Sequence, residues 1–257
     1  MLENHRVVIT GSTYGIGLGI ADAMLRAGAR VILNSNDDPA DDVLDRLSAL
    51  GECHFIKADL SSVEGAIGLV QEAHAQLGGL DCLVNNAGTF TDKPFLDNDP
   101  ADYDRIMNLN VRGYFFATQE FARLVGKREF EASVVCTGST NGLQAEKGMP
   151  LYDTSKGAVL MLVRSLSLVL ADFGIRINGV APGLIRTPLH KKVIEKDPAL
   201  CKLLDAQIPL GRRGELDDVG PVAVFLASPA AKYITGEMIY VDGGIAAQQT
   251  IWEVRGD

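Results

Sequence analysis

The chain has 257 residues, of which 47% are hydrophobic and 22% charged, and its 33 acidic residues outnumber its 24 basic ones, so the formal net charge is −9. This apolar content, in a chain of this length, is enough to bury a core, which excludes a disordered protein. An acidic chain without a long run of Lys or Arg argues against nucleic acid as the main partner.

The cysteines and the apolar stretches indicate the cellular compartment of the protein. The four cysteines, Cys53, Cys82, Cys136 and Cys201, are far apart and form no C-x-x-C pair. We expect reduced, mostly buried thiols and no metal site. The N-terminus lacks a basic segment followed by a long apolar one, and the most apolar stretch, 157–170, is too short for a membrane span. The sequence therefore predicts a soluble cytoplasmic protein without a membrane partner.

Short β-branched runs alternate with longer amphipathic stretches along the chain. The expected strands are 6–10, 31–33, 54–57, 82–85, 133–137, 176–180 and 238–241, and the expected helices are 16–27, 40–50, 62–77, 101–125, 151–173 and 217–227. This alternation indicates βαβ units with right-handed crossovers, which place helices on both faces of a parallel sheet. The predicted fold class is α/β, with a Rossmann-type, doubly wound parallel sheet of about seven strands.

No linker rich in Pro, Gly or Ser divides the chain, so we interpret residues 1–257 as a single domain. One segment, at about 187–209, departs from the pattern because it is charged and contains three prolines. We interpret this segment as an excursion from the sheet that forms a short helical lid.

A glycine-rich loop joins the first expected strand to the first expected helix. Gly11 allows a tight turn, Gly15 allows a pyrophosphate to approach the backbone, and Gly17 lets the helix pack against the strand. The helix that begins here presents free N–H groups and the positive end of its dipole. The strand before the loop and the helix after it favour a dinucleotide-binding site.

The loop spacing, G-x-x-x-G-x-G, resembles that of the short-chain dehydrogenase/reductase family in its shorter single-domain subtype. Further motifs support the resemblance in the right order: Asn85-Asn86-Ala87-Gly88, Ser139, Tyr152 and Lys156 in Y-x-x-x-K, Pro182-Gly183 and Asp242-Gly243-Gly244. The resemblance implies an oxidoreductase that transfers hydride between a nicotinamide cofactor and a hydroxyl or carbonyl group of a small molecule.

Four residues are predicted to be catalytic: Asn110, Ser139, Tyr152 and Lys156. Tyr152 and Lys156 are four residues apart in a helical pattern and therefore share one helix face. A free tyrosine has a pKa near ~10, and the ammonium favours the phenolate, so Tyr152 can take the hydroxyl proton. The resemblance gives Ser139 a hydrogen bond to the substrate oxygen and gives Asn110 a water that relays protons to Lys156. Without the resemblance, the pair would equally fit an exposed helix face.

The choice of cofactor depends on the end of the second strand, where Asn34, Ser35 and Asn36 precede two aspartates. NAD-preferring members of the family usually carry an acidic residue at the position of Ser35, and NADP-preferring members a basic one at Asn36 or Tyr14. This sequence departs from both patterns. Since no cation is expected nearby and the aspartates would repel a 2′-phosphate, NAD is favoured, with NADP as the alternative.

The resemblance implies the remaining cofactor contacts. Asp59 would meet the adenine, although it would equally serve as the N-cap of the next helix, and Thr187 would meet the nicotinamide amide. The residues expected to bind the cofactor are Gly11, Ser12, Thr13, Tyr14, Gly15, Ile16, Gly17, Asn34, Ser35, Asn36, Asp59, Leu60, Asn86, Ala87, Gly88, Tyr152, Lys156, Pro182, Gly183, Ile185 and Thr187.

The residues expected to bind substrate are Ser139, Asn141, Gln144, Glu146, Tyr152 and His190. Polar side chains suit a sugar, sugar acid or polyol, whose hydroxyls need partners when buried, whereas a steroid or acyl chain needs a more apolar lining. The lysines after His190 would meet an anionic group or simply face solvent. Another small ketone and a 3-ketoacyl thioester are the alternative substrates.

Two other classes of function are weaker alternatives. A dinucleotide-sensing protein without turnover would not need all four catalytic residues. An epimerase or dehydratase of the longer family subtype usually has the spacing G-x-x-G-x-x-G, which this chain lacks. The expected helices 101–125 and 151–173 are apolar almost all round, so we expect them to bury a second face in a homo-oligomer, either a dimer or a tetramer.

Overall fold

The computed structural model describes residues 1–127, 132–187 and 197–248. Its seven parallel strands form one sheet in the order β3-β2-β1-β4-β5-β6-β7. Because the chain moves outward from β1 in one direction and from β4 in the other, the switch point of a doubly wound sheet lies between these two strands. The predicted fold class is confirmed. The strands are β1 (Arg6–Ile9), β2 (Arg30–Ser35), β3 (Cys53–Lys57), β4 (Cys82–Asn85), β5 (Ala132–Thr137), β6 (Ile175–Pro182) and β7 (Met238–Val241).

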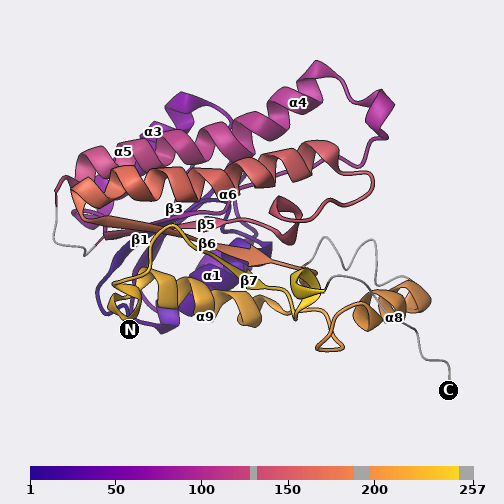
Figure 1. The fold of residues 1–257 in the computed structure, drawn as a ribbon. Helices are drawn as coiled ribbons and strands as arrows, with labels where there is room; N and C mark the ends of the chain where they lie inside the picture. Colours follow the sequence, from indigo (N-terminus) through magenta and orange to yellow (C-terminus); the bar gives the residue numbers. More distant parts are fainter. Residues whose placement is uncertain (128–131, 188–196, 249–257) are drawn as a thin grey trace.

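Helices cover both faces of the sheet (Figure 1). One layer contains α3 (Val63–Leu77), α4 (Pro100–Met107), α5 (Tyr114–Val125) and α6 (Pro150–Leu170), and the other contains α1 (Gly15–Arg26), α2 (Asp41–Ser48) and α9 (Leu216–Ala227). A further helix, α8 (Pro198–Ala206), lies apart from the sheet. Short 3₁₀ turns are η1 (Phe95–Asp97), η3 (Thr140–Gly142), η4 (Ala171–Phe173), η5 (Pro229–Ala231) and η6 (Ile245–Ala247).

The strands are apolar on both sides because each side faces a helix layer. In β1, Val8 belongs to the core under α3, α5 and α6, whereas Val7 and Ile9 belong to the core under α1, α2 and α9. This alternation follows the two-residue period of a strand. The two cores fix the sheet between the helix layers, so the loops at the carboxyl ends of the strands are held in place.

The expected helix 101–125 is interrupted. It is α4, then a π-helical turn over Asn108–Gly113, then α5. Apolar periodicity cannot reveal one such turn, because the residues on either side keep a helical pattern. Gly113 lies so close to the loop after β3 that a Cβ there would stand 2.6 Å from the carbonyl oxygen of Leu60. Turns of this kind are frequent at functional sites, and this one carries Asn110.

The expected lid is described only in part. Residues 188–196 lie outside the described ranges, and 197–209 contain α8, whose first turn is capped by the carboxylate of Asp197. Within the described ranges, no helix combines the length and apolar character that a membrane span needs. The four cysteines are free thiols, as expected.

Candidate functional site

The loop after β1 is fixed by the motif that follows β4. The Thr10 hydroxyl accepts hydrogen bonds from the backbone N–H groups of Asn86 and Ala87, at 2.8 and 2.9 Å. In return, Asn86 Nδ2 donates to the carbonyl oxygens of Thr10 and Gly11, at 3.0 and 2.8 Å. Because β1 and β4 are neighbours, the two motifs meet at the switch point of the sheet, where ligands of open α/β sheets bind.

The glycines of this loop leave room for an anion. Gly11 has φ of +59°, and a Cβ there would lie 2.7 Å from Ala87 Cα, while a Cβ on Gly17 would collide with the Gly11 carbonyl oxygen. Gly15 also has φ of +59°, yet nothing lies within 4 Å of its Cβ position. α1 begins at Gly15 without a side-chain cap or an acidic residue in its first turn. Its free N–H groups therefore suit a pyrophosphate.

Asn34 and Ser12 support this loop from behind. Asn34 is buried; its Oδ1 accepts from the Gly11 N–H at 3.3 Å, and its Nδ2 donates to the carbonyl oxygens of Ile56 and Ala58, both at 3.1 Å. The Ser12 hydroxyl is buried too and accepts from the Asn34 N–H at 3.0 Å. These two side chains hold the loop in place, and their predicted contacts with a cofactor stay a prediction.

The structure brings a cation to the end of β2, where the sequence indicated none. Lys57 is the pairing partner of Ser35 across β2 and β3, and its Nζ donates to Asp38 at 2.8 Å. The nearby carboxylate raises the pKa of Lys57. Ser35 is buried and accepts from the backbone N–H of Asp37 at 3.2 Å, whereas Asn36 is exposed. The expectation that no cation lies near this loop is therefore wrong.

Asp59 does not cap the helix that follows β3. The cap of α3 is Ser62, whose hydroxyl accepts from the Gly65 N–H at 2.9 Å. Asp59 is exposed and accepts from the Ser61 N–H at 2.9 Å, and Leu60 beside it is buried. The capping alternative for Asp59 is thus wrong. Its carboxylate stays at the surface, near the loop after β1.

Helix α6 brings Tyr152 and Lys156 together. Lys156 is only 4% exposed; its Nζ lies 5.6 Å from the centroid of the Tyr152 ring and donates to the Thr137 carbonyl oxygen at 2.9 Å. Burial lowers the pKa of Lys156 to about 8. Burial also raises the pKa of Tyr152, while its hydrogen bond to Ser139 lowers it and the charges of Glu146 and Asp153 raise it.

Asn110 lies on the π-helical turn and holds the loop after β4. Its Oδ1 accepts from the Thr89 N–H at 2.8 Å, and its Nδ2 donates to the Thr89 carbonyl oxygen and to Ser155 Oγ, at 2.8 and 2.9 Å. A Cβ on Gly88 would lie 3.4 Å from Asn110 Oδ1 and 3.7 Å from Lys156 Nζ. Gly88 therefore borders both side chains, and Oδ1 keeps one lone pair for a further donor.

Comparison with known proteins identifies the family. A sequence model of the family described as enoyl-(acyl carrier protein) reductase matches residues 11–246. The solved structure of a short-chain type dehydrogenase/reductase from Mycobacterium marinum superposes with a TM-score of 0.87 at 32% identity, covering 95% of this chain and 96% of that one. This chain belongs to the short-chain dehydrogenase/reductase family. It is an NAD(P)-dependent oxidoreductase of that family.

Two further similarities lie within the short-chain dehydrogenase/reductases. The glucose 1-dehydrogenase of Gluconobacter oxydans is 35% identical over 243 residues, which cover 93% of this chain and 91% of that protein. The RhlG–NADP complex of Pseudomonas aeruginosa superposes with a TM-score of 0.89 at 35% identity, covering 95% and 97% of the two chains. Similar chains in the family thus carry names for different substrates, so similarity alone leaves the substrate open.

Asp153 lies beside the predicted substrate-binding residues, and the sequence analysis did not single it out. Asn141 Nδ2 donates to Asp153 at 2.8 Å and to Glu146 at 3.1 Å, and the Asn141 N–H donates to Ser139 Oγ at 3.2 Å. Asn141 and Glu146, which were both predicted to bind substrate, thus bond to each other. The sequence did contain a signal for Asp153, because an acidic residue directly follows Tyr152. Its helix face meets the loop that carries Ser139.

The other predicted site residues differ in their exposure to solvent. Gln144 is exposed, Gly183 and Thr187 are half-buried, and Ile185 and Pro182 are buried. A ligand could reach Ile185 or Pro182 only through their backbone. His190 lies outside the described residues.

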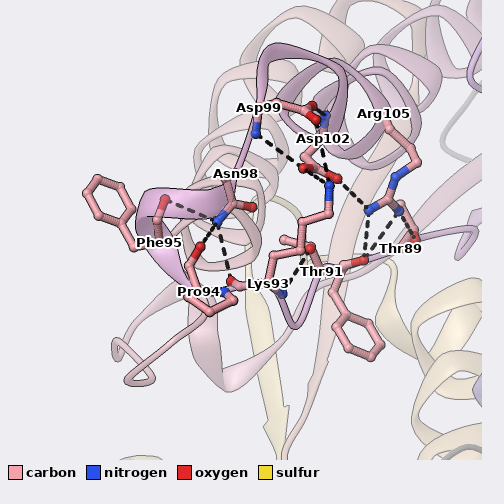
Figure 2. A network of polar contacts seen from close by, with 10 residues as sticks. Thr89, Thr91, Lys93, Pro94, Phe95, Asn98, Asp99, Asp102 and Arg105 are labelled. Atoms are coloured by element: carbon pink, nitrogen blue, oxygen red, sulfur yellow. Dashed lines mark hydrogen bonds and ion pairs between the residues drawn. The ribbon is translucent and has the colours of Figure 1, made fainter.

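A charged network from α4 holds the segment that follows Gly88 (Figure 2). Arg105 donates to Thr89 Oγ1 at 2.9 Å and to the Phe90 carbonyl oxygen at 3.3 Å. Behind it, the buried Asp102 carboxylate pairs with Arg105 at 3.6 Å and with Lys93 at 2.5 Å. No sequence pattern links these residues, because the turn before α4 brings them together.

The network reaches the proposed reaction centre through Phe90. Its ring meets the Tyr152 ring edge to face, with centroids 6.3 Å apart. Such pairs stabilise a fixed ring orientation. Among the described residues, no group of three or more His, Cys, Asp or Glu side chains could hold a metal ion.

Proposed function

We propose that this enzyme interconverts a hydroxyl and a carbonyl group on a small polar substrate, a sugar, sugar acid or polyol, with NAD as the preferred cofactor. The proposal gives catalysis to Asn110, Ser139, Tyr152 and Lys156. The observation that carries it is the hydrogen bond between the Tyr152 and Ser139 hydroxyls, above a buried ammonium 5.6 Å from the tyrosine ring. These groups have the arrangement that proton transfer to or from a substrate oxygen requires.

The loop after β1 fits a dinucleotide. The open space at Gly15 and the uncapped start of α1 support a pyrophosphate there, held by the N–H groups of Gly15, Ile16 and Gly17. Ser35 and Asn36 would meet the adenosine ribose, and Asp59 the adenine. When bound, the nicotinamide supplies or accepts the hydride. Thr13, Tyr14, Leu60 and the 182–187 segment would border the rest of the cofactor.

Tyr152 Oη is the atom that exchanges a proton with the substrate oxygen. In the protein alone, its pKa lies above the ordinary value because the side chain is buried and two carboxylates are near. A base at neutral pH needs the opposite shift, so the phenolate depends on positive charge from Lys156 and from the oxidised cofactor. Ser139 Oγ orients the substrate oxygen, and the free lone pair of Asn110 Oδ1 would accept from a water near Lys156.

The proposed preference for NAD rests on charge. Lys57 is paired with Asp38, and Asp37 adds a further carboxylate, so a 2′-phosphate would have to compete for a cation already in use. NADP is the alternative, since Lys57 is exposed and adjacent to Ser35.

The same proposal includes an assembly and a location. Phe115, Met161, Leu168 and Val169 expose 41%, 56%, 79% and 55% of their surface on α5 and α6, which supports burial of these helices in a dimer or tetramer. The free thiols support a reducing, cytoplasmic location. Residues 187–209 would act as the lid of a single domain.

The proposal is tested by following the absorbance of the reduced nicotinamide. Purified enzyme is offered NAD or NADP, each with a panel of aldoses, sugar acids, polyols, simple ketones and a 3-ketoacyl thioester. We expect turnover of at least one sugar or polyol, with higher kcat/KM for NAD. Turnover confined to the thioester or the ketones contradicts the substrate class, and no turnover with any member contradicts the proposed reaction.

A further inference from the structure

Two carboxylates lie next to the proposed reaction centre. Asp153 Oδ1 accepts from Asn141 Nδ2 at 2.8 Å, and Asp153 Oδ2 accepts from the Glu146 N–H at 2.9 Å. Glu146 Oε2 accepts from the same Asn141 nitrogen at 3.1 Å. A carboxamide nitrogen has two hydrogens, so the two carboxylates occupy both of them.

The cluster is linked directly to Ser139. Because the Asn141 nitrogen faces the carboxylates, its Oδ1 faces Ser139 Oγ, at 3.2 Å. Ser139 in turn is hydrogen-bonded to Tyr152. Only Asn141 therefore separates the two carboxylates from Ser139, and their charges raise the pKa of Tyr152.

The described part of the chain offers these carboxylates no positive partner. Their hydrogen bonds come from neutral N–H groups, and neither takes part in an ion pair there. Lys156 is buried and donates to the Thr137 carbonyl oxygen, while Lys93 and Arg105 pair with Asp102. Lys147, next to Glu146, is exposed and pairs with neither carboxylate within the described ranges. Among the described residues, the negative charge of these two carboxylates is thus uncompensated.

We propose that Glu146 and Asp153 make this enzyme select neutral or cationic substrates against anionic ones of the same skeleton. The inference rests on the proposed function and narrows it from sugars, sugar acids and polyols to neutral sugars and polyols, together with amino sugars. A substrate hydroxyl can donate to a carboxylate, whereas a substrate carboxylate would add a third negative charge beside the exposed Glu146 and the half-buried Asp153. Such repulsion is a common source of specificity.

The test compares three substrates of one configuration: a hexose, its uronic acid and its 2-amino-2-deoxy derivative. We expect kcat/KM for the hexose to exceed that for the acid by about ten-fold or more, which is the size expected of one unfavourable charge contact. In Glu146→Gln, which keeps the shape and the acceptor for Asn141, this ratio should shrink by at least three-fold. Added salt should also shrink the ratio of hexose to acid kcat/KM in the wild type.

Glu72→Gln is the matched control, because Glu72 is an exposed residue of α3 whose side chain, among the described residues, bonds only to Gln76, at 3.1 Å, on its own helix. It should leave the ratio unchanged. Equal or higher kcat/KM for the acid in the wild type overturns the inference, including the case in which cations near His190 attract the acid. An unchanged ratio in Glu146→Gln also overturns it.

A second measurement does not need turnover. The ultraviolet absorbance of tyrosinate is titrated in the wild type and in Tyr152→Phe, and the difference reports Tyr152 alone. Glu146→Gln should lower the apparent pKa of Tyr152, since this carboxylate opposes the phenolate. An unchanged titration overturns the inference. If no substrate is turned over with either cofactor, the proposed function fails, while the titration still decides whether these charges act on the site.

Discussion

The ammonium of Lys156 lies 5.6 Å from the centre of the Tyr152 ring and is held there by the Thr137 carbonyl oxygen, at 2.9 Å. The position is unfavourable for a charge, because burial lowers the pKa of Lys156 from 10.5 to about 8. Between these two values the unfolded chain binds more protons than the folded one, so this group makes stability rise with pH across that interval. The free-energy cost of burying the ammonium is greatest at neutral pH, where Lys156 is charged in both the folded and the unfolded state.

Lys156→Met should therefore stabilise the fold and abolish turnover. At pH 7 we expect the free energy of unfolding to rise by about 1–3 kcal/mol, after allowing for the lost hydrogen bond to Thr137. Urea denaturation at pH 7 and pH 10 measures the effect, and the gain should be smaller at pH 10. A variant that is less stable than the wild type at pH 7 contradicts this account of the buried ammonium.

Tyr152→Phe removes one oxygen atom and leaves the ring against Phe90. We expect kcat to fall by about 10³-fold or more, since the variant lacks the Oη atom that is proposed to exchange the proton. Cofactor affinity, measured by fluorescence of the reduced nicotinamide, should change by less than about three-fold. Ser139→Ala is the comparison, with a smaller loss of kcat. Turnover near the wild-type rate in Tyr152→Phe would refute the mechanism.

The sequence predicted the sheet and the closeness of Tyr152 to Lys156 because both depend on local patterns. An apolar run of β1 and the spacing of Tyr152 and Lys156 can be read within a few residues. The cation at Lys57 could not be found in this way, since it reaches Ser35 only through the register of β2 with β3. Asp153 was missed for a related reason: its partner Asn141 is brought to it by the loop before α6.

Asn34 shows what a motif position leaves undetermined. It stands in the motif position next to Ser35, yet its carboxamide is buried and bonded to the backbone. A position in a motif does not say whether a side chain turns to the ligand or to the protein. Only the closeness of Gly11, in the loop after β1, to Ile56 and Ala58, at the end of β3, decides this.

The ion pair of Lys57 with Asp38 provides a test of cofactor choice. Asp38→Asn leaves Lys57 free beside Ser35, where a 2′-phosphate would lie, so we expect the ratio of kcat/KM for NADP over NAD to rise by about three- to ten-fold. Asp45→Asn, on the exposed face of α2, is the control. If the ratio is unchanged, Lys57 does not reach the cofactor.

Asp102 should govern the acid stability of the segment beside the site. Its pKa is lowered, first by the hydrogen bond from Lys93 and then by the N–H of Asp99 (Figure 2). The folded pKa is below the unfolded one, near ~4, so this stabilisation is complete above that value and is lost as the pH falls through the folded pKa. Asp102→Asn should lower the urea midpoint at pH 7 and flatten its decline below about pH 4. An equal decline in both proteins would show that other carboxylates control acid unfolding.

Gly17 and Gly68 offer a matched pair of helical glycines. A Cβ on Gly17 would collide with the Gly11 carbonyl oxygen and with Asn86 Nδ2, whereas a Cβ on Gly68 would meet nothing within 4 Å. Gly17→Ala should therefore displace the loop, weaken cofactor binding by at least ten-fold and lower the unfolding midpoint. Gly68→Ala, in α3, should leave binding unchanged and raise stability by about 0.5–1 kcal/mol through helix propensity. Titration with reduced cofactor and thermal unfolding measure both effects. Normal cofactor affinity in Gly17→Ala would mean that the close contact of α1 with the two motifs is not needed for the nucleotide.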